Sequence, residues 1–176
     1  FRRVLFRSTG ATGLIGGCLV DVLMAHKGRN YNVYASGRNE ERAGRRFLKY
    51  ADDNSFHFVK YDVAHPLEYD VNFQYIIHAA SGAYPEEFIK HPVEVIKGNI
   101  NGVDNLMGYG IQHGIKRLLY ISSGEVYGEG DGRVFTENYS GYVDCTSLRS
   151  CYPSSKRAAE TLCISYGAEY GIDVVI

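Results

Sequence analysis

A tyrosine and a lysine four residues apart, Tyr152 and Lys156, are the residues best suited to chemistry in this sequence. Residues at positions i and i+4 share one helix face, and the segment runs into a predicted helix through Ala158–Leu162. An ammonium group held beside a phenol stabilises the phenolate and lowers a pKa that is normally about 10. Such a tyrosine can act as a general base toward an alcohol or a sugar hydroxyl.

The same spacing also fits the ordinary first turn of an amphipathic helix that has no catalytic role. The chain contains 15 tyrosines, so pairs of this kind are expected by chance, although only Tyr152 is followed by lysine at i+4. The spacing alone leaves both interpretations open. The question for the rest of the chain is whether it builds a cofactor site beside the pair.

A glycine-rich segment, Thr9–Gly16, indicates such a site. Its glycines fall at positions 10, 13 and 16, between the apolar run Val4–Phe6 and a predicted helix over Leu14–Met24. Glycine at a strand-to-helix junction permits a tight turn and close approach of the backbone to a pyrophosphate, which binds at the positive end of the helix. A plain glycine-rich turn is the alternative. The residues that the dinucleotide interpretation assigns to the cofactor are Gly10, Gly13, Leu14, Ile15 and Gly16.

The residues on either side of this segment carry two further expectations. Arg7 and Ser8 are unusual at the end of a buried parallel strand, which is normally apolar almost throughout. We therefore interpret the first few residues as atypical or not native. The apolar face of the predicted helix consists of Leu14, Cys18, Leu19 and Leu23.

The ends of the second and third predicted strands are candidate contacts for the adenosine half of a dinucleotide. The second strand, 31–35, leads to Gly37 and Arg38, where an acidic residue would suit NAD and an arginine suits the 2′-phosphate of NADP. Arg38 therefore favours NADP, unless it stacks on the adenine or faces solvent. The third strand, 56–60, is followed by Asp62 and Val63. Asp62 could accept a hydrogen bond from the adenine or cap a turn before His65.

The fourth predicted strand, 75–80, ends in Ala79 and Ala80, which are small enough to let a cofactor pass close to the chain. We interpret His78 as a packed structural residue. A long helix is predicted from Pro92 to His113, and Asn99 within it needs a hydrogen-bond partner if it is buried. The remaining predicted elements are a helix over 39–50 that Asn39 caps, a fifth strand over 116–122 and a strand pattern over 172–176.

The alternation of strands and helices predicts an α/β fold, a Rossmann-type doubly wound parallel sheet with helices on both faces. Ligands of such sheets bind beyond the carboxyl ends of the strands. Four candidate segments fall at such ends, namely the glycine segment, Asp62, Ala79–Ala80 and Ser122–Glu125. A long polar loop over 124–148 then leads to the tyrosine–lysine helix, and loops of this length are uncommon unless they are functional.

Composition limits the classes of function. The chain has 176 residues, 45% hydrophobic and 22% charged, and a net charge of −1, which predicts one globular domain and indicates no nucleic-acid or membrane partner. The four cysteines show no CxxC spacing, so we expect reduced thiols in a cytoplasmic protein and no metal site. Phe1 in place of methionine, and a last strand pattern without a following turn, predict a fragment of a longer chain.

Together these segments resemble the extended short-chain dehydrogenase/reductase family, the NAD-dependent epimerases, dehydratases and decarboxylases of nucleotide sugars. The resemblance covers essentially the whole chain and lies in Thr9–Gly16, Asp62–Val63, His78–Ala80, Asn99, Ser123–Gly128 and Tyr152–Lys156. It implies that 1–176 is an incomplete NAD(P)-binding Rossmann domain, with the substrate-binding portion beyond Ile176. It also implies a tightly bound, recycled NAD or NADP, a nucleotide-sugar substrate and a homodimer when the protein is full length.

The resemblance implies a role for each catalytic candidate. Tyr152 would take the proton of the sugar 4-hydroxyl, while Lys156 would hold the nicotinamide ribose and lower the pKa of the tyrosine. Ser123 would hydrogen-bond the same hydroxyl. Asn99 would have a structural and relay role.

Glu125 and the segment Arg149–Tyr152 resemble the UDP-glucuronate decarboxylases, which have Thr-Ser-Glu and Arg-Ser-Cys-Tyr at these places. UDP-galactose-type epimerases lack the carboxylate, and dTDP-glucose 4,6-dehydratases have Thr-Asp-Glu. This chain departs from the decarboxylases at Gly124 and at Pro153–Ser155. The resemblance therefore implies decarboxylation or 4,6-dehydration, with a 4-epimerase or a non-catalytic dinucleotide-binding domain as alternatives, and an inactive fragment when 1–176 stands alone.

Overall fold

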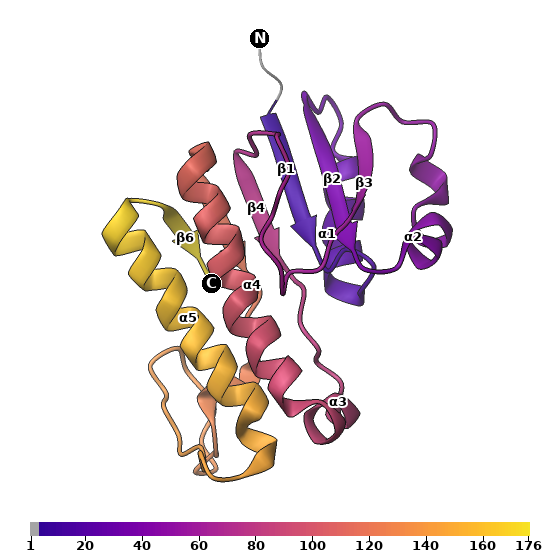
Figure 1. Ribbon diagram of the computed structural model, residues 1–176. Coiled ribbons are helices and arrows are strands. Elements are labelled where there is room, and N and C mark those ends of the chain that lie inside the picture. The colour runs from indigo at the N-terminus through magenta and orange to yellow at the C-terminus, as the bar shows by residue number, and fades with distance from the viewer. Residues whose placement is uncertain (1–3) are drawn as a thin grey trace.

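The computed structural model describes residues 4–176 and shows the predicted alternation of strands and helices (Figure 1). The prediction about atypical first residues partly concerns residues 1–3, which lie outside the described residues. The strands are β1 (Val4–Thr9), β2 (Tyr31–Gly37), β3 (Phe56–Lys60), β4 (Tyr75–His78), β5 (Arg117–Tyr120) and β6 (Asp173–Val175). The helices are α1 (Leu14–Ala25), α2 (Glu40–Arg46), α3 (Pro85–Lys90), α4 (Pro92–His113) and α5 (Cys151–Tyr170). Three 3₁₀ turns are η1 (Leu48–Tyr50), η2 (Gly124–Tyr127) and η3 (Leu148–Ser150).

Within the described residues, the strands form one parallel sheet in the order β3-β2-β1-β4-β5-β6. The chain winds outward from β1 to β3 and then returns to place β4 on the other side of β1. Because the direction of winding reverses between β1 and β4, their carboxyl ends form the switch point at which sheets of this kind bind ligands. The predicted fold class is confirmed.

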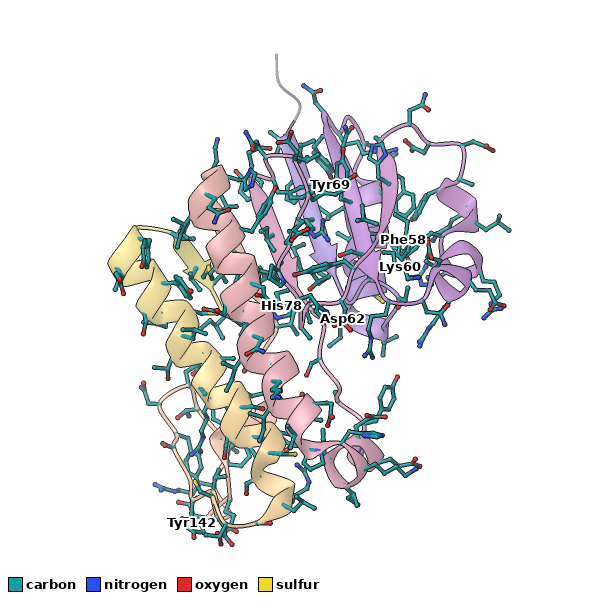
Figure 2. The ribbon with its side chains drawn as sticks, viewed as in Figure 1. Phe58, Lys60, Asp62, Tyr69, His78 and Tyr142 are labelled. Carbon is teal, nitrogen blue, oxygen red and sulfur yellow. The ribbon has the colours of Figure 1, made fainter. Side chains whose placement is uncertain are left out.

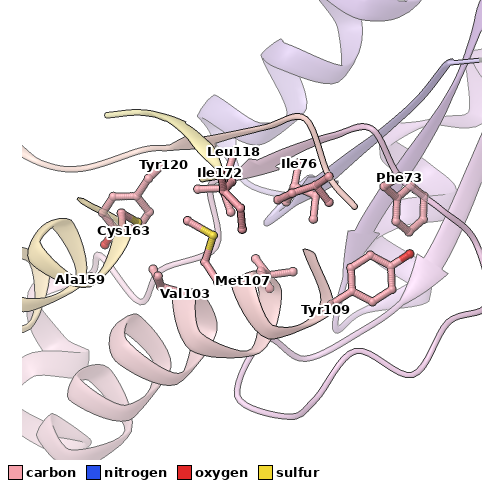
Figure 3. Close-up of a cluster of buried hydrophobic side chains, with 12 residues drawn as sticks. Phe73, Ile76, Val103, Met107, Tyr109, Leu118, Tyr120, Ala159, Cys163 and Ile172 are labelled. Atoms are coloured by element: carbon pink, nitrogen blue, oxygen red, sulfur yellow. The ribbon is translucent and has the colours of Figure 1, made fainter. Parts of the chain in front are cut away.

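Two hydrophobic clusters on opposite faces hold the helices against the sheet. On β2 the side chains alternate, because Val33 and Ala35 pack with α1 and α2, whereas Tyr34 packs on the face covered by α4 and α5. The larger cluster, drawn in Figure 3, joins the sheet to those two long helices. Its buried members include Phe73, Ile76, Val103, Leu106, Met107, Leu118, Tyr120, Ala159 and Cys163.

The predicted apolar face of α1 is wrong at Leu14 and Cys18, whereas Leu19 is half-buried and Leu23 packs on the cluster beneath the helix. Leu14 is 84% exposed and Cys18 is exposed, whereas the buried residues of the helix are Gly16, Gly17, Val20 and Met24. The reason is that α1 packs closely against the loop before it, where a side chain on Gly16 would collide with the carbonyl of Gly10. Glycines therefore occupy the buried side of the first turns of α1, and the larger Leu14 and Ile15 are directed outward there.

The boundaries of other elements agree with expectation to different degrees. Helix α4 spans the predicted range and ends at Gly114, whose φ of 64° stops it. Asn39 caps α2 as predicted, since its side chain accepts from the backbone N–H of Arg42. However, α2 ends at Arg46, β4 and β5 each end two residues early, and the short helix α3 was not predicted.

Strand β1 continues through Arg7 and Ser8 despite their polarity. The Arg7 backbone pairs with Tyr34 on one side and Ile76 on the other, and its side chain is fully buried. The guanidinium carbon lies 4.8 Å from the ring centroid of Tyr61 and 5.3 Å from that of Phe73, but its three nitrogens have no hydrogen-bond partner among residues 4–176. Burial lowers the pKa of Arg7 to about 10.

We predict that Arg7→Leu stabilises the chain. A buried cation without hydrogen bonds carries a desolvation penalty that the surrounding rings offset only in part, so its removal should raise the free energy of unfolding by roughly 1–3 kcal/mol. Urea unfolding of the 176-residue chain measures this. The exposed Arg42→Leu is the matched control and should change stability by less than about 0.5 kcal/mol. A less stable Arg7→Leu variant would contradict the interpretation.

Candidate active site

The glycine loop between β1 and α1 packs against the ends of two neighbouring strands. Gly10 has a φ of 65°, and a Cβ built on it would lie 2.5 Å from the carbonyl oxygen of Ala79 at the end of β4. The backbone N–H of Ala11 donates to the carbonyl of Ser36 in β2 at 3.0 Å. The loop therefore closes over the switch point, and only glycine fits at position 10.

The start of α1 has the properties of an anion-binding site. Gly13 is the N-cap residue and offers no side-chain hydrogen bond, so backbone N–H groups of the first turn are left for a ligand. Leu14 and Ile15 are 84% and 55% exposed beside these groups. The structure thus brings the predicted glycine-loop residues together at the carboxyl edge of the sheet, where the first turn of α1 begins.

Arg38 and Asp62 lie at the ends of the neighbouring strands β2 and β3. Arg38 Nη1 is 4.0 Å from Asp62 Oδ2, and Arg38 is largely exposed. The other carboxylate oxygen of Asp62 accepts from the backbone N–H of Ala64 at 3.0 Å. Asp62 therefore caps the turn before His65, which was one of its two predicted roles. The carbonyl of Val63 accepts from Asn105 on α4. Figure 2 shows Asp62 and His78 at the same edge of the sheet.

Tyr152 and Lys156 lie in the first two turns of α5, and both are nearly buried. Lys156 Nζ donates to the carbonyl of Ile121, just beyond β5, at 2.8 Å. The same nitrogen lies 4.6 Å from the ring centroid of Tyr120 and 5.9 Å from that of Tyr152. Burial lowers the pKa of Lys156 to about 8. The pair is therefore adjacent in space, as the i, i+4 spacing predicted.

Asn99 is 1% exposed on α4 and its amide has the partners that its burial requires. Its Oδ1 accepts from Ser81 Oγ at 2.8 Å, and its Nδ2 donates to Ser155 Oγ at 2.9 Å. Ser155 in turn donates to the carbonyl of Cys151. The amide thus joins α4, α5 and the segment after β4. Sequence reasoning missed both serines, although Ser81 follows Ala80 directly.

Just beyond β5, Ser123 is the N-cap residue of η2 and Glu125 lies on that turn. Ser123 Oγ accepts from the backbone N–H of Glu125 at 3.2 Å and so caps the turn. The Glu125 carboxylate accepts a charge-assisted hydrogen bond from Arg149 Nη2 at 2.6 Å. Both charged residues line a cavity of about 380 Å³ with Tyr142 and Ser150. Arg149 carried the family resemblance in the sequence, but no role was predicted for it.

Arg157 holds η2 and the long loop against α5. Its Nε donates to the carbonyl of Val126 at 2.6 Å, and its Nη2 donates to the carbonyl of Gly141 at 2.9 Å. Because Val126 follows Glu125 directly, Arg157 connects the turn that carries the carboxylate to the helix that carries Tyr152. Sequence reasoning did not identify this arginine either, since its partners are backbone atoms.

His78 is fully buried at the end of β4, as expected of a structural residue. Its Nδ1 and the hydroxyl oxygen of Thr9 are 2.8 Å apart, which connects β4 to the residue before Gly10. Its Nε2 has no hydrogen-bond partner in the part of the chain that the structure describes. Burial, with a smaller effect of nearby Lys156, lowers the pKa of His78 to about 3. The imidazole is therefore neutral at physiological pH.

Other features of the described residues lie away from this edge. A cavity of about 860 Å³ lies near the opposite edge of the sheet, where its lining includes Lys27, Arg29 and Asp53 but none of the predicted site residues. Between residues 4 and 176 the structure contains no cluster of three or more His, Cys, Asp or Glu side chains able to hold a metal ion. Over the same range, no helix combines the length and the apolar character needed to cross a membrane.

The parallel sheet, its switch point and the glycine loop define a Rossmann-type domain. The chain belongs to the NAD dependent epimerase/dehydratase family, whose sequence model matches residues 9–176. The family predicted from the resemblance is confirmed. The match begins at Thr9, directly after the unusual pair Arg7 and Ser8.

Curated relatives include UDP-glucuronic acid decarboxylases. The chain is 33% identical over 175 residues to UDP-glucuronic acid decarboxylase 1 of Danio rerio, and 35% identical over 171 residues to UDP-glucuronic acid decarboxylase 6 of Arabidopsis thaliana. These matches cover 98% and 96% of this chain but 40% and 48% of the relatives. The chain therefore spans less than half the length of either protein.

Solved structures with the same fold include enzymes of other branches. The UDP-glucuronic acid 4-epimerase from Bacillus cereus, in complex with UDP-glucuronic acid and NAD, matches with a TM-score of 0.80 and 22% identity. The dTDP-glucose 4,6-dehydratase from Bacillus anthracis, in complex with NAD, matches with a TM-score of 0.77 and 20% identity. They cover 98% and 97% of this chain, which covers 55% and 53% of them. At these identities the likeness concerns the fold.

We predict that Gly10→Ala destabilises the chain more than Gly28→Ala does. Both glycines have positive φ, 65° and 75°, so both substitutions carry a backbone penalty of about 1–2 kcal/mol. Only Gly10 faces backbone atoms within contact distance, whereas a Cβ on Gly28 would meet nothing within 4 Å. The collision should therefore add roughly 1–3 kcal/mol at Gly10, measured by urea unfolding. Equal losses would show that the loop relaxes away from Ala79.

We also predict that His78 makes stability depend on pH. Because its folded pKa lies below the unfolded value, its contribution is fully present above about pH 6.5 and is lost as pH falls toward 3. From about pH 7 to about pH 5 the wild type should lose roughly 2 kcal/mol more than His78→Asn. Urea unfolding at several pH values measures this. The exposed His26→Asn is the control and should keep the wild-type slope.

Proposed function

We propose that the whole protein containing this chain is a nucleotide-sugar enzyme that oxidises the sugar C4 hydroxyl with bound NAD or NADP and then acts at C5 or C6. UDP-glucuronate decarboxylation is the favoured reaction, and 4,6-dehydration of a nucleoside-diphosphate glucose is the close alternative. The observation that carries the proposal is the position of Glu125 on η2, at the edge where Tyr152 and Lys156 lie. The names of the curated relatives favour decarboxylation.

The carboxyl edge of the sheet has residues suited to each part of the cofactor. The glycine loop and first turn of α1, including Gly10, Gly13, Leu14, Ile15 and Gly16, would hold the pyrophosphate. Arg38, Asp62 and Val63 would face the adenosine half, and Ala79 and Ala80 would leave room for the chain of the dinucleotide. The exposed Arg38 and the absence of an acidic residue at the end of β2 favour NADP. NAD or NADP held by these residues would supply hydride transfer in both directions and would therefore not be consumed.

Tyr152 is proposed to accept the proton of the C4 hydroxyl as a general base. Lys156 Nζ lies 5.9 Å from the centroid of the Tyr152 ring and would be the cationic neighbour of the tyrosine during that step. Ser123 would hydrogen-bond the same hydroxyl. Asn99, with Ser81 and Ser155, keeps the helix of Tyr152 in place against α4 and would relay a proton.

The ketone formed at C4 determines the next step on the substrate. In a uronic acid the C6 carboxylate is β to that ketone, so the C5–C6 bond can break with release of carbon dioxide. The electron pair remains in an enolate, which then takes a proton at C5 that Glu125 in its acid form can deliver. In a glucose nucleotide the ketone acidifies the C5 proton, which Glu125 can remove while water leaves from C6. The carboxylate at Glu125 fits these reactions better than simple 4-epimerisation, which needs no such group. A non-catalytic domain would not need Ser123, Tyr152 and Lys156 together.

The assembly and location are further parts of the proposal. A homodimer would form through α4 and α5, whose large exposed hydrophobic residues include Val93, Ile96, Ile111, Ile164 and Tyr170. A cytoplasmic location fits the free thiols of the chain, which are Cys18, Cys145, Cys151 and Cys163.

The test is turnover of the whole protein with UDP-glucuronate and, separately, with dTDP-glucose. We expect release of carbon dioxide from UDP-glucuronate, measured with a substrate labelled at C6. A 4-keto-6-deoxy product from dTDP-glucose would instead assign the dehydratase reaction. Interconversion of UDP-glucose and UDP-galactose, without either product, would replace the proposal with a 4-epimerase.

The variant Tyr152→Phe is the matched control for the chemistry. It should lower turnover at least about 100-fold, because it removes the general base while keeping the ring. Binding of the dinucleotide, followed by fluorescence of the reduced nicotinamide, should change little. Turnover equal to that of the wild type would refute the role of Tyr152.

A further inference from the structure

The short helix α3 contributes one buried aromatic residue, Phe88, between two parts of the candidate site. Phe88 is 2% exposed and its ring stacks on that of Tyr152, with centroids 4.7 Å apart and planes 23° from parallel. The guanidinium carbon of Arg149 lies 4.6 Å from the same Phe88 centroid. Phe88 is therefore the common neighbour of the proposed base and of an arginine on η3.

The arginine in turn holds a carboxylate. Arg149 Nη2 donates to Glu125 Oε1 at 2.6 Å, and this hydrogen bond raises the pKa of Arg149. A continuous series of contacts thus runs from Glu125 through Arg149 and Phe88 to Tyr152. Its members come from η2, η3, α3 and α5, so four separate segments contribute one residue each.

Stability alone does not account for this arrangement. The Arg149 side chain is 51% exposed and that of Glu125 is 36% exposed, and ion pairs so open to solvent are worth at most about 1 kcal/mol. A glutamate has three rotatable side-chain bonds, so without the arginine its carboxylate would occupy several positions. Stacking on Phe88 limits the positions of the planar guanidinium, and the guanidinium then limits those of the carboxylate.

The other end of the series is held by close packing. Phe88 belongs to a buried cluster with Val95, Cys151 and Tyr152, which joins α3 to α4 and α5. The Cys151 thiol also contacts the carbonyl of Phe88 at 3.8 Å. Phe88 therefore has little freedom to move relative to the tyrosine ring.

We propose that Arg149 and Phe88 are positioning residues, which set where the Glu125 carboxylate lies relative to Tyr152. The inference rests on the proposed function for its catalytic consequence. Reactions at C5 and C6 need a second group at a defined distance from the C4 base, because misplacement of a reacting group by an ångström can slow a step about 100-fold. The series of contacts provides such a defined distance. The step at C4 depends on Tyr152 and Lys156 and does not need Glu125.

The kinetic test separates the two steps in the whole protein. With UDP-glucuronate in a single turnover, Arg149→Met and Phe88→Leu should lower formation of the decarboxylated sugar nucleotide, which requires the proton transfer at C5, at least about 10-fold while reduction of the nicotinamide changes less than about 3-fold. Arg149→Lys should restore product formation only in part, since lysine lacks the planar fork. Arg117→Met, which removes an exposed ion pair with Asp173 away from the site, is the control and should change neither signal. Equal loss of both signals would reduce the two residues to a structural role.

A second measurement does not depend on turnover. In urea unfolding of the chain, we compare the double variant Glu125→Gln, Phe88→Leu with the two single variants. Its unfolding equilibrium constant should differ by about 2- to 5-fold from the value expected for independent effects, because Arg149 contacts both residues. The coupling should vanish when Arg149→Met is present in every variant of the cycle. Additive effects would overturn the positioning proposal. Coupling without reaction of either substrate would instead refute the proposed function and leave the contact series intact.

Discussion

The burial of the Lys156 ammonium at the carboxyl end of β5 is the constraint on which the site depends. A buried cation is costly unless it is partnered, and this one has a single backbone carbonyl, that of Ile121, together with the ring face of Tyr120. Helix α5 must therefore begin where β5 ends. That requirement places Tyr152, one turn earlier on the same helix face, at the edge to which the glycine loop and the end of β4 also belong.

Side chains from distant segments preserve this placement. Asn99 bridges Ser81 and Ser155, so α4 fixes the rotation of α5. Arg157 holds the turn that carries Glu125 by binding the backbone carbonyl next to it. These polar contacts are buried or partly buried, and losing one partner would leave the other unsatisfied, which is costly in a region of low dielectric.

The glycine loop and the tyrosine–lysine helix meet from opposite sides of the switch point. Gly10 approaches Ala79 closely enough to exclude any side chain, and Thr9 contacts His78 within the sheet. On the other side, Lys156 is near enough to influence the pKa of His78. Because β1 and β4 are paired neighbours, Thr9 and His78 lie side by side between the two halves. The family match from residue 9 onward covers both halves.

Local patterns in the sequence determined the fold class, the full range of α4, the Asn39 cap and the i, i+4 placement of Tyr152 and Lys156. These features follow from backbone geometry and nearest neighbours, which a sequence records directly. Only the tertiary structure decided which face of α1 is buried, because close packing at Gly16 outweighs the apolar periodicity.

Contacts between residues far apart in the chain could not be predicted from the sequence either. Glu125 and Arg149 are 24 positions apart, and Asn99 and Ser155 are 56 apart. Phe88 lies on a helix that periodicity did not reveal, and it meets Tyr152 only because α3 packs on α5. The polar and aromatic types of these residues were visible in the chain. Which of them come into contact depends on how the sheet and its helices pack, and no local rule contains that information.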